Sequence, residues 1–431
     1  LTVASGATIT NNGTQTGFGR TGTVDWDTAS IKTTGFTAVS GNGYFCNTNG
    51  GAFTATLPAS PTAGDIVAVA DYTRTFTSNN LTIGRNSKPI GGVSEDATLD
   101  VNGQSATFVF VDDTEGWINI QETQTSQTGV PPFIIATGGT PCAGATCGDF
   151  KVHTFTGPGT FCVSAVSGCS PASNEVSYVI VAGGGGAGNG DNTGGGGAGG
   201  FRESKSGVDV YSPASPLEGS TNVTVTTTAY PIVVGGGGAG GAGAGACGAI
   251  GTQGDNSVFA CVTSTGGGGG GGGRPATPDQ GTTGGSGGGN GHTKSSAGGA
   301  GNTPSTSPAQ GTSGGAGAGC STPPAFAAGA GGGATVAGAA GSPSVGGAGG
   351  TGATTSITGS GVARAGGGGG GAETDPAGGA GGTGGGGAGK AASGIAGTIN
   401  TGGGGGGTGS GSPNTGGTGG SGVVIIRYKF Q

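Results

Sequence analysis

The stretch between Val181 and Ser421 is the feature that most limits what this chain can fold into. Its glycines occur in runs, among them 266–273 and 402–407, separated by Ala, Ser, Thr and Asn. The whole chain has 115 glycines in 431 residues, whereas the usual share is about 7%. Because glycine and alanine have almost no side chain to bury, an ordinary hydrophobic core cannot be built from this stretch.

The same stretch is almost uncharged, whereas disordered segments are usually rich in charge. We therefore expect it to be ordered by its backbone, because each N–H and C=O group needs a partner once it is buried. Chains without Cβ atoms approach each other closely, so left-handed three-fold helices of the polyglycine II type can pack side by side. Collagen needs glycine at every third position, and that period is absent. Pro and polar residues predict turns at 274–280, 303–310, 321–326 and 373–377.

The residues before this stretch predict an all-β fold. Residues 1–22 are either a flexible leader or an extended arm that adds as a strand to a neighbouring subunit. Residues 23–121 contain regularly spaced apolar runs between turn residues, which predicts a β-sandwich-like domain. Tight turns are expected at Asn42-Gly43, Gly50-Gly51 and Asn102-Gly103. The expected strands are 36–39, 44–46, 52–57, 66–70, 81–83, 107–111 and 117–120, and the expected core residues are Trp26, Phe45, Phe53, Phe108, Phe110 and Trp117.

Residues 122–150 are rich in Thr, Gln, Pro and Gly and predict a linker. Residues 151–431 are expected to form the glycine-rich domain with framing strands. The apolar segments that predict these strands are 152–155, 160–163, 176–181, 223–234 and 423–430. We expect them to pair into a base from which the glycine runs emerge.

Eight cysteines bear on the redox setting of the protein. Their spacing does not fit the short intervals of zinc ligands, so disulfides and an extracellular location are favoured. Eight cysteines allow 105 connectivities. The local pairs are candidates only: Cys142 with Cys147, Cys162 with Cys169, and Cys247 with Cys261.

Composition and motifs exclude several classes of function. The net charge is −7 and Lys and Arg total 14 without a cluster, so no nucleic-acid surface is expected. No apolar run is long enough to span a bilayer. His153 and His292 have no triad partners, and Asp112, Asp113 and Glu115 lack the alternation of a calcium loop. We predict no enzyme, cofactor or metal. The sequence contains no Met, so we expect it to begin after a processing site or to be incomplete.

Three triplets have the N-glycosylation pattern Asn-X-Ser/Thr, beginning at Asn12, Asn80 and Asn222. Such triplets also arise by chance in a Thr-rich chain. They are candidate modification sites on an exposed protein.

Several segments of this chain resemble the glycine-rich tail-fibre and adhesin proteins of bacteriophages, especially those of marine phages. The segments are Val152–Phe161, Tyr178–Gly186, Gly199–Arg202, Gly422–Phe430 and, in the first domain, Thr56–Asp65. The resemblance implies a virion appendage or extracellular fibre with a host-binding tip. It also implies glycine runs packed as polyglycine II helices, with the inserts between them forming receptor-binding loops.

These observations lead to one main expectation and two alternatives. The main expectation is a fibre or adhesin subunit, assembled with copies of itself, that binds a host-surface glycan or protein. The alternatives are an extracellular filament joined through residues 1–22 and a secreted carbohydrate-binding protein. Receptor contact is expected from the insert 201–220 and the turn near 326, with Phe201, Arg202, Tyr211 and Phe326 as candidates.

Overall fold

The chain forms two compact units, Leu1–Gly129 and Val130–Gln431. The computed structural model describes residues 23–123, 133–168, 171–242, 248–273, 279–319, 326–373, 377–411 and 414–431. Within these ranges every regular element is a strand except one 3-10 turn, η1 (Pro171–Asn174). The expected all-β fold is confirmed.

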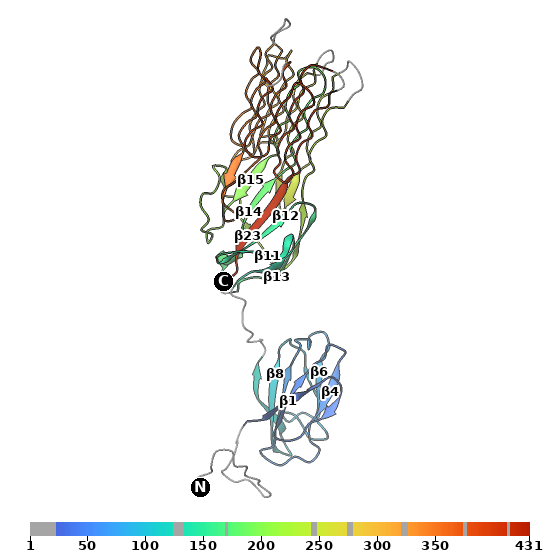
Figure 1. Ribbon diagram of the computed structural model, residues 1–431. Helices are drawn as coiled ribbons and strands as arrows, with labels where there is room; N and C mark the ends of the chain where they lie inside the picture. The colour runs from blue at the N-terminus through green and yellow to red at the C-terminus, as the bar shows by residue number, and fades with distance from the viewer. Residues whose placement is uncertain are drawn as a thin grey trace. The chain divides into compact units, whose positions relative to one another are not determined.

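The first unit is a sandwich of two sheets (Figure 1). One sheet has the order β1 (Asp25–Lys32), β3 (Asn42–Cys46), β5 (Ile66–Asp71), β8 (Ser105–Asp112), β9 (Gly116–Thr123). The other has the order β2 (Phe36–Thr37), β4 (Phe53–Thr56), β6 (Leu81–Gly84), β7 (Ala97–Leu99). One buried cluster takes side chains from both, including Tyr44, Phe108 and Trp117 from the first sheet and Leu81 and Ile83 from the second. This shared core confirms the sandwich-like domain.

Strand alternation decides which of the expected core residues are buried. Phe108 and Phe110 point inward from β8 and are buried, as expected. Trp26 was expected in the core, but its side chain is 38% exposed. Its ring packs against that of Phe45, with 4.9 Å between the ring centres, on the face of the sheet opposite the core. The reason is register, because Tyr44 takes the inward position and its neighbour Phe45 therefore points outward.

The turn expected at Asn42-Gly43 is also wrong, because both residues lie within β3. Gly43 pairs with Trp26 of β1. A Cβ atom on Gly43 would lie 2.7 Å from the Trp26 ring. This glycine therefore makes room for an aromatic side chain and does not form a turn.

The second unit begins with strands in a segment that was expected to be a linker. β10 (Ile135–Thr137) and β11 (Thr140–Cys147) both lie within 122–150, so that expectation is wrong for these residues. One sheet has the order β10, β13 (Gly159–Ala165), β18 (Ala229–Val233), β19 (Ser257–Phe259), β20 (Val262–Ser264). The other has the order β11, β12 (Phe150–Phe155), β23 (Val423–Lys429), β14 (Glu175–Val181), β15 (Phe201–Ser204), β16 (Glu218–Gly219), and β17 (Val223–Thr224) pairs with β14.

β14 and β23 frame the glycine region as expected. They pair antiparallel, and Val181 lies opposite Val423, so both ends of the glycine region start from neighbouring positions. One face of this strand pair packs on the other sheet, through residues such as Tyr178 and Ile426. The opposite face packs under the insert that follows β15. Burial on both faces explains the unbroken apolar runs 178–181 in β14 and 423–426 in β23.

Beyond the strands, the glycine runs lie side by side in a bundle (Figure 1). The run 183–189 bonds through its backbone to six neighbouring runs, which are 193–200, 235–242, 248–256, 265–273, 402–410 and 414–421. The same neighbour returns at every third residue: Gly183, Gly186 and Asn189 all donate to the run 248–256. Lateral backbone hydrogen bonds therefore take the place of a side-chain core.

Glycine is required in the runs because of close approach between backbones. A Cβ atom on Gly196 would lie 2.1 Å from the carbonyl oxygen of Gly185. A Cβ on Gly404 would lie 2.0 Å from the carbonyl oxygen of Gly196. Neither carbonyl can move away without losing its own hydrogen bond to a neighbouring run. The density of glycine is thus set by the packing of the bundle.

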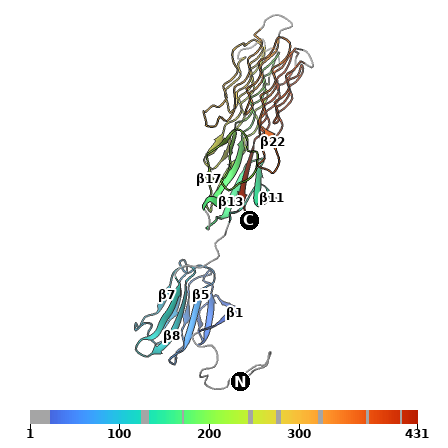
Figure 2. The same ribbon diagram turned by 90° about the vertical axis from the view of Figure 1, so that its left-hand side faces the viewer.

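The expected turn at 303–310 joins two runs at the strand end of the bundle, where Asn302 donates to the carbonyl of Gly285 and Thr303 to that of Gly284. The other three expected turns lie largely outside the described residues. A hairpin of β21 (Ala353–Thr355) and β22 (Val362–Arg364) also lies at this end, and Figure 2 shows β22 where the strands give way to the runs.

His153 is a structural residue inside the second unit. Its side chain is fully buried on β12, where Nδ1 donates to the carbonyl of Gly138 at 2.7 Å. Its Nε2 lies 3.2 Å from the hydroxyl oxygen of Tyr428. Burial lowers the pKa of His153, because the charged ring would lose its hydration.

We predict that Gly196→Ala lowers the free energy of unfolding by at least about 2 kcal/mol, because the new methyl group overlaps a fixed carbonyl. Gly207→Ala is the matched control, since nothing lies within 4 Å of a Cβ placed there. The control is expected to change stability by less than about 0.5 kcal/mol. Thermal unfolding of both variants measures the difference, and equal melting temperatures would contradict this account of the runs.

A second prediction concerns pH. The unfolded His153 has a pKa of about 6.5 and the folded one a lower pKa, so the unfolded state takes up the proton first. Stability from this residue is complete above about pH 6.5 and is lost as pH falls through the folded pKa, by at most about 1.4 kcal/mol per pH unit. In denaturant titrations from pH 7.5 to 4.5, the wild type should lose more stability than His153→Gln. Parallel curves for the two proteins would show that His153 does not titrate in this way.

Candidate functional site

The insert after β15 does not present its aromatic residues to a receptor. Phe201 is 1% exposed and Tyr211 is 6% exposed, and both belong to the cluster that covers the outer face of β14 and β23. Arg202 is half-buried on β15. The expectation of receptor contact is therefore wrong for Phe201 and Tyr211, because their side chains form part of the core.

A buried ion pair fixes this insert to the last strand. Nε of Arg427 donates to both carboxylate oxygens of Asp209 at 3.0 Å. The hydroxyl of Ser177 donates to the same carboxylate at 2.8 Å, and the Arg427 guanidinium lies 4.4 Å from the centre of the Phe150 ring. A buried pair with all its partners resists separation, because removal of one member leaves an uncompensated charge.

Glu203 anchors the other end of the insert. Its carboxylate accepts hydrogen bonds from the Tyr211 hydroxyl at 2.9 Å, from the Ser215 N–H at 2.8 Å and from the Thr355 hydroxyl. Burial, together with the nearby Glu203 charge, raises the pKa of the Tyr211 hydroxyl, so Tyr211 remains a neutral donor. These contacts make the insert a brace between β15, β23 and the β21–β22 hairpin.

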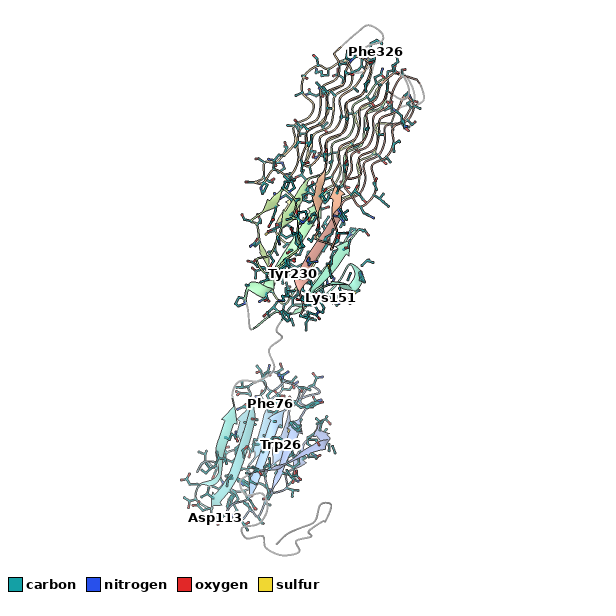
Figure 3. The ribbon with its side chains drawn as sticks, turned by 60° about the vertical axis from the view of Figure 1, so that its left-hand side comes forward. Trp26, Phe76, Asp113, Lys151, Tyr230 and Phe326 are labelled. Atoms are coloured by element: carbon teal, nitrogen blue, oxygen red, sulfur yellow. The ribbon has the colours of Figure 1, made fainter. Side chains whose placement is uncertain are left out.

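Phe326 is the candidate that lies at a cavity. Figure 3 places it at the end of the glycine bundle farthest from the strands. The cavity has a volume of about 130 Å³, and its lining is Asp191, Asn192, His292, Phe326, Glu373 and Ser410. We call this set of residues the tip pocket. Each of its members lies at the end of a glycine run, in a segment between two runs.

The hydrogen bonds of the bundle hold the tip pocket in place. The Asn192 N–H donates to the carbonyl of Gly409 at 3.3 Å, and the Nδ1 of His292 donates to the carbonyl of Asn192 at 3.4 Å. Asp191 accepts from the N–H of Gly411 at 3.2 Å. The rings of His292 and Phe326 meet edge to face at 5.2 Å. The pocket is thus built by contacts between residues far apart in the sequence.

Asn192 has two unusual features. Its φ is 56°, in the left-handed region that few residues other than glycine adopt. Its side chain is 2% exposed, and its Oδ1 has no hydrogen-bond partner. A buried acceptor without a donor costs about 1–3 kcal/mol, so such an atom in a pocket marks a place for a ligand donor.

Sequence reasoning found Phe326 and missed the other five members of the tip pocket. Asp191 and Asn192 lie between two glycine runs, and Glu373 lies within an expected turn. The sequence therefore marks these residues as lying between runs. The sequence does not show which of the many inserts meet. That information lies in the order in which the runs pack.

The expected disulfides are not formed among the described cysteines. Cys142 and Cys147 are both free, so this expected pair is wrong. Cys162 and Cys261 are free as well, and their expected partners Cys169 and Cys247 lie outside the described residues. Cys46 is buried in the first unit, where burial raises the pKa of its thiol to about 12.

The glycosylation candidates have different settings. Asn222 is exposed, and its amide nitrogen donates to Glu175 at 3.2 Å. Asn80 is half-buried beside β6, and Asn12 lies outside the described residues.

The acidic cluster of the first unit belongs to the β8–β9 hairpin. Asp112 accepts the N–H groups of Thr114 and Glu115 at 2.8 Å, and Asp113 pairs with Lys88 at 2.5 Å. In the described part of the chain, no group of three His, Cys, Asp or Glu residues could hold a metal ion. No helix in that part is long and apolar enough to cross a membrane.

Comparison with known proteins bears on the second unit. A search of curated proteins finds no match to this chain. A family model described as a glycine-rich domain matches residues 155–429, which is more than half of the chain. That description says nothing of tail fibres. The match runs from the end of β12 to the end of β23 and so includes the strands, the runs and the tip pocket: the chain belongs to this glycine-rich domain family.

Proposed function

We propose that this chain is a structural subunit of an extracellular fibre, of the phage tail-fibre and adhesin type, that binds a receptor on a host surface. The observation that carries the proposal is the position of the tip pocket at the far end of a hydrogen-bonded bundle (Figure 3). A fibre needs a stiff support and a contact site at its end. The strands and the runs supply the stiff support, and the tip pocket supplies the contact site.

The proposal includes a specific form for the runs, the left-handed three-fold helix of polyglycine II. The hydrogen-bond partner returns every third residue, which is the repeat of such a helix. The run 183–189 has six bonded neighbours, the number expected for hexagonal packing of parallel rods. Bonds in all lateral directions would resist bending, because any displacement of one run disturbs several others.

The role proposed here is binding without catalysis. The partners are other copies of the chain and a glycan or protein of the host surface. The proposed location is the outside of a particle or cell. A protein in this location can be stable without disulfides. Stability comes from the two sandwich cores, the buried Asp209–Arg427 pair and the backbone network of the runs.

The test uses an antibody raised against the full chain. Antibodies that also bind a variant with Asp191, Asn192 and Glu373 replaced by Gly are removed first. We expect the remaining antibodies to label the free ends of surface appendages. Electron microscopy of native particles or cells is the measurement. Purified full-length chain should also compete for host attachment. The same variant is the control and should compete at least about tenfold less well. Label along the whole surface, or equal competition by both proteins, would overturn the receptor-binding role.

A second function, assembly into a filament, is favoured by a partly apolar cavity on the surface of the first unit. The outer face of β1, β5, β8 and β9 carries a cavity of about 160 Å³ lined by Thr23, Val24, Trp26, Ile66, Thr107, Ile120 and Gln121. Ile120 is 57% exposed on this face. Residues 1–22 precede Thr23, which lies in the lining of this cavity. We therefore propose that residues 1–22 of another copy occupy the cavity and add as a strand beside these strands.

Deletion of residues 1–22 is then expected to abolish filaments and to leave the melting temperature of the remaining chain unchanged. Ile120→Asp should have the same effect on assembly, because a charged side chain in the cavity lining would be desolvated by the arm. Asp113→Asn, on the hairpin that ends β8, is the surface control. Light scattering and electron microscopy measure assembly, and filaments that persist after the deletion would rule out this joint.

A further inference from the structure

The tip pocket has more hydrogen-bond acceptors than donors. It contains the carboxylates of Asp191 and Glu373 and the Oδ1 of Asn192, which is buried and without a partner. No Lys or Arg belongs to its described lining. The nearby Lys294 lies 3.9 Å from Asp279 instead. A ligand for this pocket must therefore bring donors, and a positive charge would be favoured over a negative one.

The donor is more readily an organic group than a metal ion. In the described residues, no three His, Cys, Asp or Glu side chains converge as metal ligands. An ammonium group instead brings three donors and one charge, and carboxylates and an amide oxygen accept from it directly. An aromatic ring beside the site adds attraction for a cation. Phe326 supplies that ring.

The remaining lining favours a sugar over a simple amine. The hydroxyl of Ser410 donates to the carbonyl of Glu373 at 3.3 Å and retains lone pairs that can accept from a sugar hydroxyl. The cavity of about 130 Å³ has the volume of roughly four water molecules. It therefore takes one edge of a single sugar ring, whose C–H face can lie on Phe326.

We infer that the tip pocket binds an amino sugar with a free ammonium group, a hexosamine that is not acetylated. In this arrangement the ammonium group lies between the carboxylates of Asp191 and Glu373, and a hydroxyl group donates to Oδ1 of Asn192. The inference rests on the proposed function for its biological role, since it names the receptor group that the fibre end would recognise.

The test uses the full-length chain and isothermal titration with glucosamine, N-acetylglucosamine, glucose and pentylamine at neutral pH and low salt. We expect glucosamine to bind at least about tenfold more tightly than the other three, because only it has both the charge and the hydroxyls. Glu373→Gln should weaken glucosamine binding about tenfold, the loss expected for one hydrogen bond to a charged group. Asn192→Gly, which suits the positive φ, should weaken glucosamine and glucose alike.

Asp255→Asn is the matched control, because it removes the same charge from an exposed residue bonded to Gly183, at the strand end of the same runs. It should leave glucosamine binding unchanged, and thermal unfolding should show all variants folded. Equal binding of glucosamine and N-acetylglucosamine, equal binding of pentylamine, or an unchanged affinity in Glu373→Gln would each overturn the inference.

Failure of this inference differs from failure of the proposed function. If purified chain competes for host attachment but does not bind glucosamine, the fibre role stands and the amino sugar is wrong. If glucosamine binds with the expected selectivity but the chain does not compete, the pocket stands and the receptor role falls.

Discussion

The glycine region depends on backbones that approach each other more closely than any side chain permits. A Cβ atom on Gly185 would lie 2.1 Å from the carbonyl oxygen of Gly268, while the N–H of Gly185 donates to Gly197 at 2.8 Å. The same absence of a side chain that removes the hydrophobic effect therefore makes a dense hydrogen-bond network possible. Each net bond contributes only about 1 kcal/mol, and ordering each glycine costs roughly 1–2 kcal/mol or more. Such a network is stable only when something else brings its ends together.

The strands supply that anchor. Because Val181 and Val423 are paired neighbours, the first and last runs start from fixed positions, and the intermediate runs are held between them. Hydrophobic burial on both faces of β14 and β23 stabilises this pair strongly, whereas an exposed hairpin would be marginal. The insert after β15 completes the anchor, since the Asp209–Arg427 pair ties it to the last strand. Phe201 and Tyr211, which were expected to bind a receptor, thus serve the stability of the base.

Sequence reasoning found the elements whose signal is local. Alternation identified β8, continuous apolar residues identified β14 and β23, and glycine content identified the bundle. Sequence reasoning failed for residues whose structure is decided by pairing or packing with residues distant in the sequence. β11 carries Pro141 and Gly144 and is mostly exposed, so it has no strand signal of its own and forms by pairing with β12. Trp26 faces outward because of its register with β3. The tip pocket joins segments near 191, 292, 326, 373 and 410, and only the packing order of the runs determines that these meet.

This architecture separates the residues that stabilise the fold from those that are free to change. The lateral bonds of runs such as those of Gly196 and Gly404 join backbone to backbone, so they do not depend on which side chains occupy the ends of the runs. Asp191 and Glu373 can therefore be replaced without removing the lateral contacts of Gly196 or Gly404. The converse does not hold, because a methyl group at Gly196 or Gly404 would overlap a carbonyl that is itself hydrogen-bonded to a neighbouring run. A binding site at the far end of such a bundle can take different side-chain chemistries on one constant support. This is the physical reason for placing the proposed receptor site at the tip pocket and not on the strands.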